Sequence, residues 1–256
     1  MSDRLTSKDE WNTYWKGIKL PLEVKRGINR TDDIILDTIE RFAPLRGTQV
    51  LEVGGAPGQF LAYLLRHHDI QGHVLDYSDV GCEQTHANLS ALGLAASVHQ
   101  ADLFANTFAQ RFDVVYSLGL VEHFEDFEQV VAKHVALVKP GGTLVLGCPN
   151  FRGPTAWALR QVAPKLLAQH NLTTMDSRRW ARLSATLPIE QVSLEYVGGF
   201  EPRLWIPRES NSLVAMTISL GARVFRRLMP ERILSQTNGE FTSQYLLGVF
   251  RRRQGD

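Results

Sequence analysis

Short apolar runs alternate with amphipathic segments over the first 150 residues of the chain. The runs are rich in Val and Leu and are bounded by glycine or polar turns, which predicts buried parallel strands. The segments between them carry apolar residues at helical spacing. This alternation predicts an α/β fold with a doubly wound, mostly parallel sheet. The predicted strands include residues 50–53, 74–75, 97–101, 114–115 and 143–149.

Two helices are predicted before the first strand. Residues 9–18 place four apolar or aromatic side chains on one helical face. That face fits either a helix buried at the domain edge or a lid in which Tyr14 and Trp15 cover a ligand. A second helix is expected from Thr31, a suitable N-cap residue, to a stop at Pro44. The residues on the first helical face are Trp11, Tyr14, Trp15 and Ile18.

The simple alternation breaks down after residue 150. Residues 151–188 read as two amphipathic helices around a polar centre, which predicts a helical cap over the carboxyl end of the sheet. Residues 189–197 and 242–250 predict two further strands, for seven in all. The helix expected over residues 213–229 is basic and amphipathic, a pattern that can lie on a membrane but more often covers a sheet face.

These elements divide the chain into four expected parts. Residues 1–45 form N-terminal helices and a lid, and residues 46–150 form a ligand-binding core. Residues 151–188 form the helical cap. Residues 189–256 supply the C-terminal strands and helix that complete the sheet.

Composition excludes several classes of partner. The 256 residues carry a net charge of +1, so no large positive field favours nucleic acid. There is no run of 18 apolar residues for a membrane span and no apolar signal-peptide core, which predicts a cytoplasmic protein. Cys82 and Cys148 are expected to be free thiols, and the eight scattered histidines predict no metal site. The pattern leaves monomer and homodimer open.

The stretch VLEVGGAPGQF at residues 50–60 carries the main chemical motif. A buried strand turns through glycines into a helix, so a ligand could lie against bare backbone, and Pro57 is expected in the first helical turn. A dinucleotide fingerprint would need glycines at positions 56 and 59, which are Ala56 and Gln59. Glu52 would also repel a pyrophosphate, whereas it suits a positively charged amino group.

At this point the sequence resembles the class I S-adenosylmethionine (SAM) dependent methyltransferases. Their first motif is an acid followed by alternating glycines, which stands here as Glu52, Gly54, Ala56 and Gly58. The KPGG turn before the fifth strand is also similar to this superfamily. The resemblance covers roughly residues 50–149. It implies a Rossmann-like core that binds SAM, and it is the small-molecule methyltransferases that the chain resembles most.

The resemblance also implies roles for the residues that follow the strands. Asp76 ends the second strand, about as far from the glycine turn as the acid that binds a ribose in dinucleotide folds. Asp102, after the third strand, matches the acid that accepts from the adenine amino group, and Leu103 is expected on the adenine face. The cofactor contacts are expected from Glu52, Gly54, Gly55, Ala56, Gly58, Asp76, Tyr77, Asp102, Leu103, Ser117, Leu118 and Gly119.

The methyl acceptor is expected beside the loop after strand four. Ser117 to Gly119 form that loop, and Glu122 and His123 are expected to open the next helix, with Glu122 complementing the helix dipole. His123 is a candidate base because an ordinary histidine pKa near 6.5 suits proton removal, although it could equally pack at the helix start. His170 in the cap is a second catalytic candidate. Acceptor contacts are expected from Tyr14, Trp15, His123, Asn150, Trp157 and His170.

The predicted function is transfer of a methyl group from SAM to a small-molecule or carrier-bound metabolite. Two alternatives stay open at this point. The Ala56-Pro57-Gly58 turn is also similar to RNA 2′-O-methyltransferases, although the lysine and aspartate expected of that family are missing after strands four and five. A non-catalytic SAM-binding subunit would keep the same cofactor residues.

Overall fold

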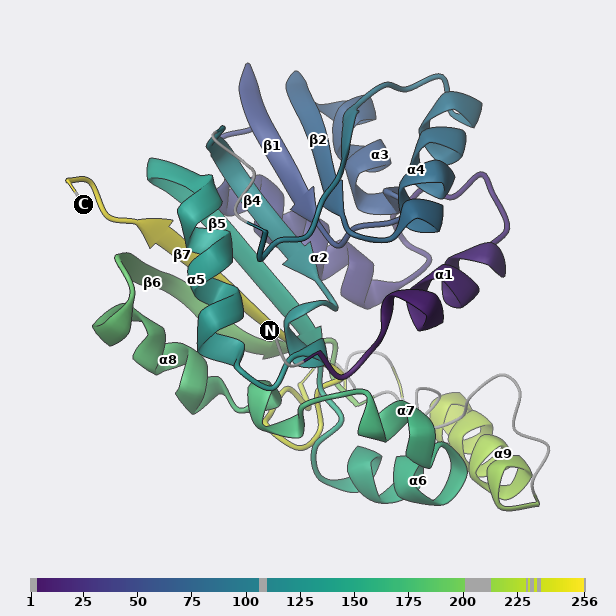
Figure 1. Ribbon diagram of the computed structural model, residues 1–256. Helices are drawn as coiled ribbons and strands as arrows, with labels where there is room; N and C mark the ends of the chain where they lie inside the picture. The colour runs from purple at the N-terminus through teal and green to yellow at the C-terminus, as the bar shows by residue number, and fades with distance from the viewer. Residues whose placement is uncertain are drawn as a thin grey trace.

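A seven-stranded sheet forms the centre of the computed structural model, which describes residues 4–105, 110–200, 213–228, 230, 233 and 236–255. The strand order is β3-β2-β1-β4-β5-β7-β6, and among these strands β7 alone runs antiparallel to its neighbours. The doubly wound, mostly parallel sheet predicted from the sequence is therefore confirmed (Figure 1). The strands are β1 (Thr48–Val53), β2 (Ile70–Asp76), β3 (Ser97–Gln100), β4 (Phe112–Leu118), β5 (Val138–Pro149), β6 (Ile189–Val197) and β7 (Tyr245–Arg252).

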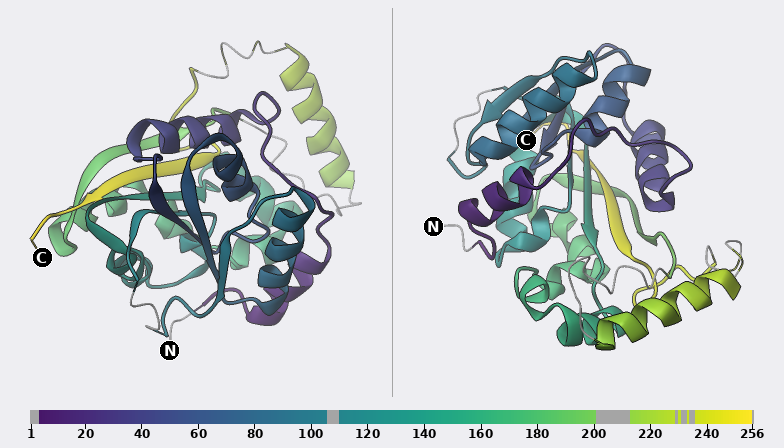
Figure 2. Two further views of the ribbon diagram at one scale, coloured as in Figure 1. Left: turned by 90° about the horizontal axis from the view of Figure 1, so that it is seen from above. Right: turned by 90° about the vertical axis from the view of Figure 1, so that its right-hand side faces the viewer.

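Helices cover both faces of the sheet, and each face has its own apolar core. On one face, α2 (Arg30–Phe42) and α3 (Gln59–His67) bury residues such as Leu36 and Leu64 against β1, β4 and β7. On the other face, α5 (Phe127–Leu137) and α8 (Ser177–Thr186) pack against β1, β4 and β5. Helix α4 (Asp79–Ala91) lies beside β2 and β3. Figure 2 shows these layers from two further sides.

The N-terminal helix α1 (Lys8–Lys16) lies near the carboxyl ends of the parallel strands and packs against α4 (Figure 1). Its first turn is fixed by a capping box in which Ser7 accepts from the Glu10 N–H and the Glu10 carboxylate accepts from the Ser7 N–H. The helix was expected over residues 9–18, but it ends at Lys16 because the chain turns at Gly17. The second helix begins one residue before the expected Thr31, with Asn29 as its N-cap.

Two turn predictions are wrong in detail. Helix α3 begins at Gln59 and its N-cap is Gly58, so Pro57 lies before the helix rather than in its first turn. After β4, residues Val121–His123 form a separate 3-10 turn, η1, and α5 begins later with Asp126 as its side-chain cap. Glu122 therefore does not complement the dipole of α5.

The segment after β5 contains more elements than the two helices predicted. It forms α6 (Pro154–Val162), α7 (Pro164–Ala168), the 3-10 turn η2 (Leu172–Met175) and α8. Of these, α8 is no cap, because its Trp180 is fully buried in the core beneath the sheet. Only the first part of the segment extends past the carboxyl edge of the sheet (Figure 1).

The late helix α9 (Leu213–Leu228) does not cover a sheet face, so that prediction is wrong. It packs beside α6, away from the sheet (Figures 1 and 2). Met229, which was expected at its end, lies outside the described residues. None of the helices described is both long enough and apolar enough to cross a lipid bilayer.

Candidate active site

A cavity of about 1040 Å³ lies at the carboxyl ends of β1, β2 and β4. Its lining comes from the turns after these strands, from the N-terminal segment with α1, and from α7 with the residues that follow it. In an open α/β sheet this edge is where ligands bind, because loops from neighbouring strands meet there. The cavity therefore stands where the sequence predicted the site.

The β1–α3 turn forms a bare backbone wall of this cavity. Gly54 has φ 67°, a left-handed conformation that favours glycine. A Cβ atom at Gly55 would stand 2.1 Å from Cδ of Glu52, so no side chain can replace that glycine without displacing the carboxyl group. The two glycines leave the backbone open to a ligand and keep Glu52 directly beneath it.

Two carboxyl groups lie at this end of the cavity, one from β1 and one from β2. Glu52 is 2% exposed, and its Oε2 atom has no hydrogen-bond partner among the described residues. Burial raises the pKa of Glu52 to about 8 and that of Asp76 to about 6. The Ser78 backbone N–H donates to Asp76 at 2.9 Å, which leaves further acceptor capacity on the carboxylate. Both groups are arranged to receive donors or a cation.

The third predicted acid, Asp102, is differently placed. It does not line the cavity, and its carboxylate is bound by the guanidinium of Arg4. Partial burial alone would raise the pKa of Asp102, but hydrogen bonding to Arg4 and to the Phe104 N–H holds it below the ordinary value. The Arg4 guanidinium also lies 4.6 Å from the ring centroid of Tyr77. Of the three predicted acids, Asp102 is thus already paired within the chain.

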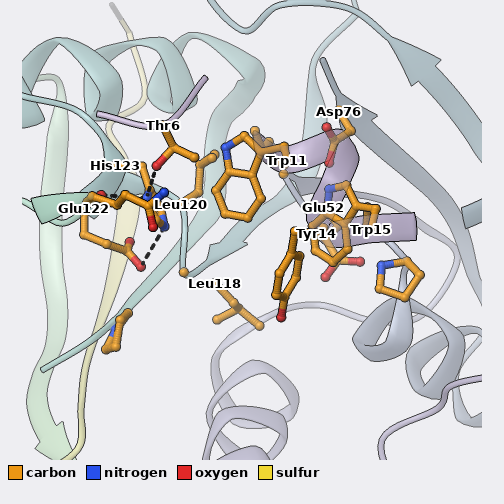
Figure 3. Close-up of a pocket in the computed structure, with 18 of the residues that line it drawn as sticks. Thr6, Trp11, Tyr14, Trp15, Glu52, Asp76, Leu118, Leu120, Glu122 and His123 are labelled. Carbon is orange, nitrogen blue, oxygen red and sulfur yellow. Dashed lines mark hydrogen bonds and ion pairs between the residues drawn. The ribbon is translucent and has the colours of Figure 1, made fainter. Parts of the chain in front are cut away.

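The side chains of Trp11, Tyr14 and Trp15 form an aromatic wall between the two ends of the cavity. Trp11 and Trp15 of α1 stack with ring centroids 5.8 Å apart, and the ring of Trp11 meets that of His123 edge-on at 4.9 Å. Figure 3 shows Trp11 between the histidine end and the acidic end, with Tyr14 beside Leu118. Flat apolar surfaces of this kind exclude water from bound planar groups. Of the two interpretations of α1, the arrangement supports the lid.

The opposite end of the cavity is formed by Glu122, His123 and His170. The rings of His123 and His170 have centroids 4.4 Å apart, and Nε2 of His123 lies 3.8 Å from Oε1 of Glu122. Nδ1 of His123 is 2.9 Å from the carbonyl oxygen of Gln169 and 2.9 Å from the hydroxyl of Thr6. Three segments far apart in sequence therefore hold this cluster together.

Burial keeps the cluster in its uncharged form. It lowers the pKa of His123 to about 3, with a further contribution from His170, and it raises the pKa of Glu122 to about 8. The pKa of His170 is also lowered by burial. At neutral pH both imidazoles are therefore neutral. The expectation of an ordinary histidine pKa at His123 is wrong because the ring is removed from water.

Most of the residues predicted to contact a ligand line the one cavity, and five do not. Ser117 is fully buried within β4, which runs through Leu118, so the predicted loop begins later. The Asn150 amide donates to the carbonyl oxygens of Glu240 and Ser243, and Trp157 is 61% exposed on α6. Gly58 and Asp102 are the others outside the lining. The predicted residues that line the cavity are Tyr14, Trp15, Glu52, Gly54, Gly55, Ala56, Asp76, Tyr77, Leu103, Leu118, Gly119, His123 and His170.

Several lining residues were missed by sequence reasoning. Arg4, Thr6 and Gln169 sit in segments with no motif, so nothing in the sequence signalled them. Glu122 was interpreted as a helix-dipole residue. Trp11 could have been included, because its spacing to Tyr14 and Trp15 already placed it on their helical face.

Comparison with known proteins agrees with this geometry. Residues 50–142 match the family described as methyltransferase domain. A ubiquinone biosynthesis O-methyltransferase from Coxiella burnetii is 27% identical over 145 residues, which cover 56% of this chain and 58% of that protein. Its counterpart from Xanthomonas campestris is 26% identical over 186 residues, covering 70% of this chain and 77% of that protein. The match to the Coxiella protein thus spans less than two thirds of that relative.

Solved structures show the same fold at lower identity. A SAM-dependent methyltransferase from Thiobacillus denitrificans, in complex with S-adenosyl-L-homocysteine, aligns with a TM-score of 0.58 at 19% identity, covering 95% of this chain and 98% of that chain. One from Geobacter sulfurreducens aligns with a TM-score of 0.56 at 16% identity, covering 99% and 100%.

Together the sheet and its cavity define a Rossmann-like α/β protein with a large cavity at the carboxyl ends of the strands. The domain match covers the part of the chain that holds the glycine turn and the acid before it. Residues 50–142 match the methyltransferase domain family, and the chain shares its fold with SAM-dependent methyltransferases of solved structure.

Proposed function

We propose that this protein transfers a methyl group from SAM to a hydroxyl group of a small-molecule acceptor. The observation that carries this proposal is one continuous cavity with two carboxyl groups at one end and a buried histidine cluster at the other. Its volume of about 1040 Å³ is at the upper limit of single-ligand sites, so it has room for two molecules side by side. The relatives named for O-methyl transfer support the choice of a hydroxyl acceptor.

The residues of the acidic end suit SAM. Glu52 has an unpartnered buried oxygen to receive the α-ammonium group, and Asp76 has acceptor capacity for the ribose hydroxyls. The bare backbone of Gly54 and Gly55 allows close approach. When bound, SAM supplies a methyl group on a positively charged sulfur. A cation beside Glu52 would favour its ionised form and lower the pKa that burial has raised.

The aromatic wall and the histidine cluster suit the acceptor. Trp11 and Tyr14 offer flat surfaces to an aromatic or other planar acceptor. Its hydroxyl oxygen forms the new bond to the methyl carbon while the carbon–sulfur bond breaks and its electron pair stays on sulfur. The hydroxyl proton passes to Nε2 of His170 or, less readily because burial lowers its pKa to about 3, to Nε2 of His123.

The release of S-adenosylhomocysteine with a panel of phenolic acceptors tests the activity. We expect His123→Asn and His170→Asn to lower kcat about 10²-fold or more, the usual contribution of a general base, while SAM affinity changes less than twofold. His86→Asn is the matched control, because that histidine is exposed on α4 and outside the cavity.

Binding of SAM without product from any acceptor would instead support a non-catalytic SAM-binding protein. Salt-sensitive retention of RNA on filters, with methyl transfer to it, would overturn the small-molecule acceptor.

A further inference from the structure

Glu122, His123 and His170 form a cluster that the transfer of one proton does not fully explain. Each offers one ligand atom, and the three atoms lie within 4.8 Å of one another. We propose that this cluster binds a divalent transition-metal ion of the zinc type. Its role toward the acceptor rests on the function proposed above, whereas the binding of the ion does not.

The hydrogen bonds of both histidines free the same ring nitrogen. Nδ1 of His123 lies 2.9 Å from the carbonyl oxygen of Gln169, and Nδ1 of His170 lies 2.7 Å from that of Leu166. A carbonyl oxygen only accepts, so Nδ1 carries the proton in both rings and Nε2 keeps its lone pair. Metal-binding histidines are held in this way, with the second nitrogen donating to a backbone carbonyl.

Glu122 supplies the negative charge that the site needs. Its side chain is 1% exposed, and its Oε2 atom has no hydrogen-bond partner among the described residues. A buried carboxyl oxygen without a partner is costly, and a cation beside the two imidazoles would satisfy it. Two neutral imidazoles and one carboxylate are a ligand set that zinc and related ions accept.

The three ligand atoms must move slightly closer together to coordinate one ion. Ligand atoms about 2.1 Å from a tetrahedral ion lie about 3.4 Å apart, so the widest separation in the cluster must shrink. Nε2 of His123 and Oε1 of Glu122, 3.8 Å apart, are already close to this separation, so a small side-chain movement is enough. All three residues line the cavity, which leaves the remaining coordination positions open toward the acceptor.

An ion with open positions at this point would bind the acceptor hydroxyl as its oxyanion. A bound cation would lower the pKa of a coordinated hydroxyl group, so its proton would pass to solvent water and not to the ligating Nε2 atoms, in place of the transfer to histidine described above. The resulting oxyanion would then attack the methyl carbon as the carbon–sulfur bond breaks. The ion stays divalent throughout and no oxidant is required. This assigns the acceptor a hydroxyl group accessible to a metal.

Titration of chelator-treated protein with Zn²⁺, followed by calorimetry, tests the proposal without any activity assay. We expect one ion per chain with a dissociation constant below about 10⁻⁶ M, and a loss of at least about 100-fold in affinity for Glu122→Gln and for His170→Asn, since each removes a ligand. His86→Asn should bind Zn²⁺ like the wild type. SAM affinity, measured on the same samples, should change less than twofold because the acidic end is intact.

The wild-type protein also gives a readout that does not depend on the variants folding. Zn²⁺ should shift the Nε2 resonances of two histidines in nitrogen NMR spectra and leave their Nδ1–H protons in place. Failure of Zn²⁺ to bind more tightly than about 10⁻⁵ M, or shifts at other histidines, would overturn the metal site. Zinc binding without methyl transfer to any acceptor would uphold the site and overturn the function proposed above.

Discussion

Replacement of Asp76 by asparagine tests the acidic end of the cavity most directly. Asp76 ends β2, is 6% exposed and lines the cavity, and its carboxylate accepts from the backbone N–H of Ser78, with those of Ala56 and Tyr77 also interacting with it. Asparagine has the same shape and keeps one oxygen for that bond. The substitution therefore removes the charge and one acceptor without opening a cavity in the core.

The magnitude follows from the contact that is lost. A hydrogen bond to a charged group contributes about 1.5–3 kcal/mol, and every 1.4 kcal/mol is a factor of about ten in affinity. The amide NH₂ of the introduced asparagine can still donate to a ribose oxygen, which recovers part of the loss. We therefore expect Asp76→Asn to weaken SAM binding by about 10- to 100-fold in calorimetric titration, and adenosine binding by a similar factor.

Asp79→Asn is the matched control. Asp79 lies three residues further on, pairs with Lys8 and is outside the cavity lining, so its loss should change SAM affinity less than twofold. Thermal unfolding of both variants separates binding from stability. A change below threefold in Asp76→Asn, with the fold intact, would refute the assignment of this carboxylate to the ribose.

Three further predictions concern charge and packing. Burial raises the pKa of Glu52 to about 8 and that of Asp76 to about 6, so SAM affinity should rise from pH 6 to 8 as a larger fraction of both carboxyl groups is ionised. In Glu52→Gln calorimetry should find the rise above pH 7 abolished, and its persistence there would exclude Glu52 as the partner of the ammonium group. Arg4→Gln should release Asp102 and tighten SAM binding several-fold, whereas weaker binding would mean that the arginine itself holds the cofactor. Gly147→Ala would place a Cβ atom 2.4 Å from a facing tyrosine ring and should lower the free energy of unfolding by about 1–3 kcal/mol in urea. Gly221→Ala meets open space within α9 and should instead raise it by about 0.5–1 kcal/mol, so a loss of stability in both variants would refute the packing argument.

Periodicity in the sequence predicted most of the fold. The alternation of strand and helix patterns gave a seven-stranded, mostly parallel sheet, and the strand expected over residues 189–197 has those bounds in the structure. Such patterns are local, because the apolar residues of a buried strand or of an amphipathic helix recur within a few positions of one another. The position of α9 in the fold could not be predicted from its local sequence pattern. Its amphipathic pattern fits a sheet face, but the sheet faces near it are already covered by other helices.

The residues of the candidate site also divide into those that local sequence patterns predicted and those that they did not. Glu52 and Asp76 were found from the sequence because each stands at a strand end beside a recognisable turn, and parallel strands end at one edge of the sheet. Asp102 also follows a strand end, yet its carboxylate is bound by the guanidinium of Arg4. No local sequence pattern could reveal this pairing, because the two residues lie far apart in the chain. Asn150 was placed at a strand end too, but its amide holds the backbone of residues 240 and 243 instead.

The sequence by itself determined the sheet, the glycine turn and the acids beneath it, because these depend on residues that are close together in the chain. The tertiary structure alone decided the histidine end of the cavity. There the N-terminal segment, the turn after β4 and the residues after α7 meet, and Nδ1 of His123 bonds the Thr6 hydroxyl and the Gln169 carbonyl oxygen, each more than forty residues away in the chain. Their burial in that contact sets the protonation of Glu122, His123 and His170, and burial is a property of the folded chain rather than of any motif.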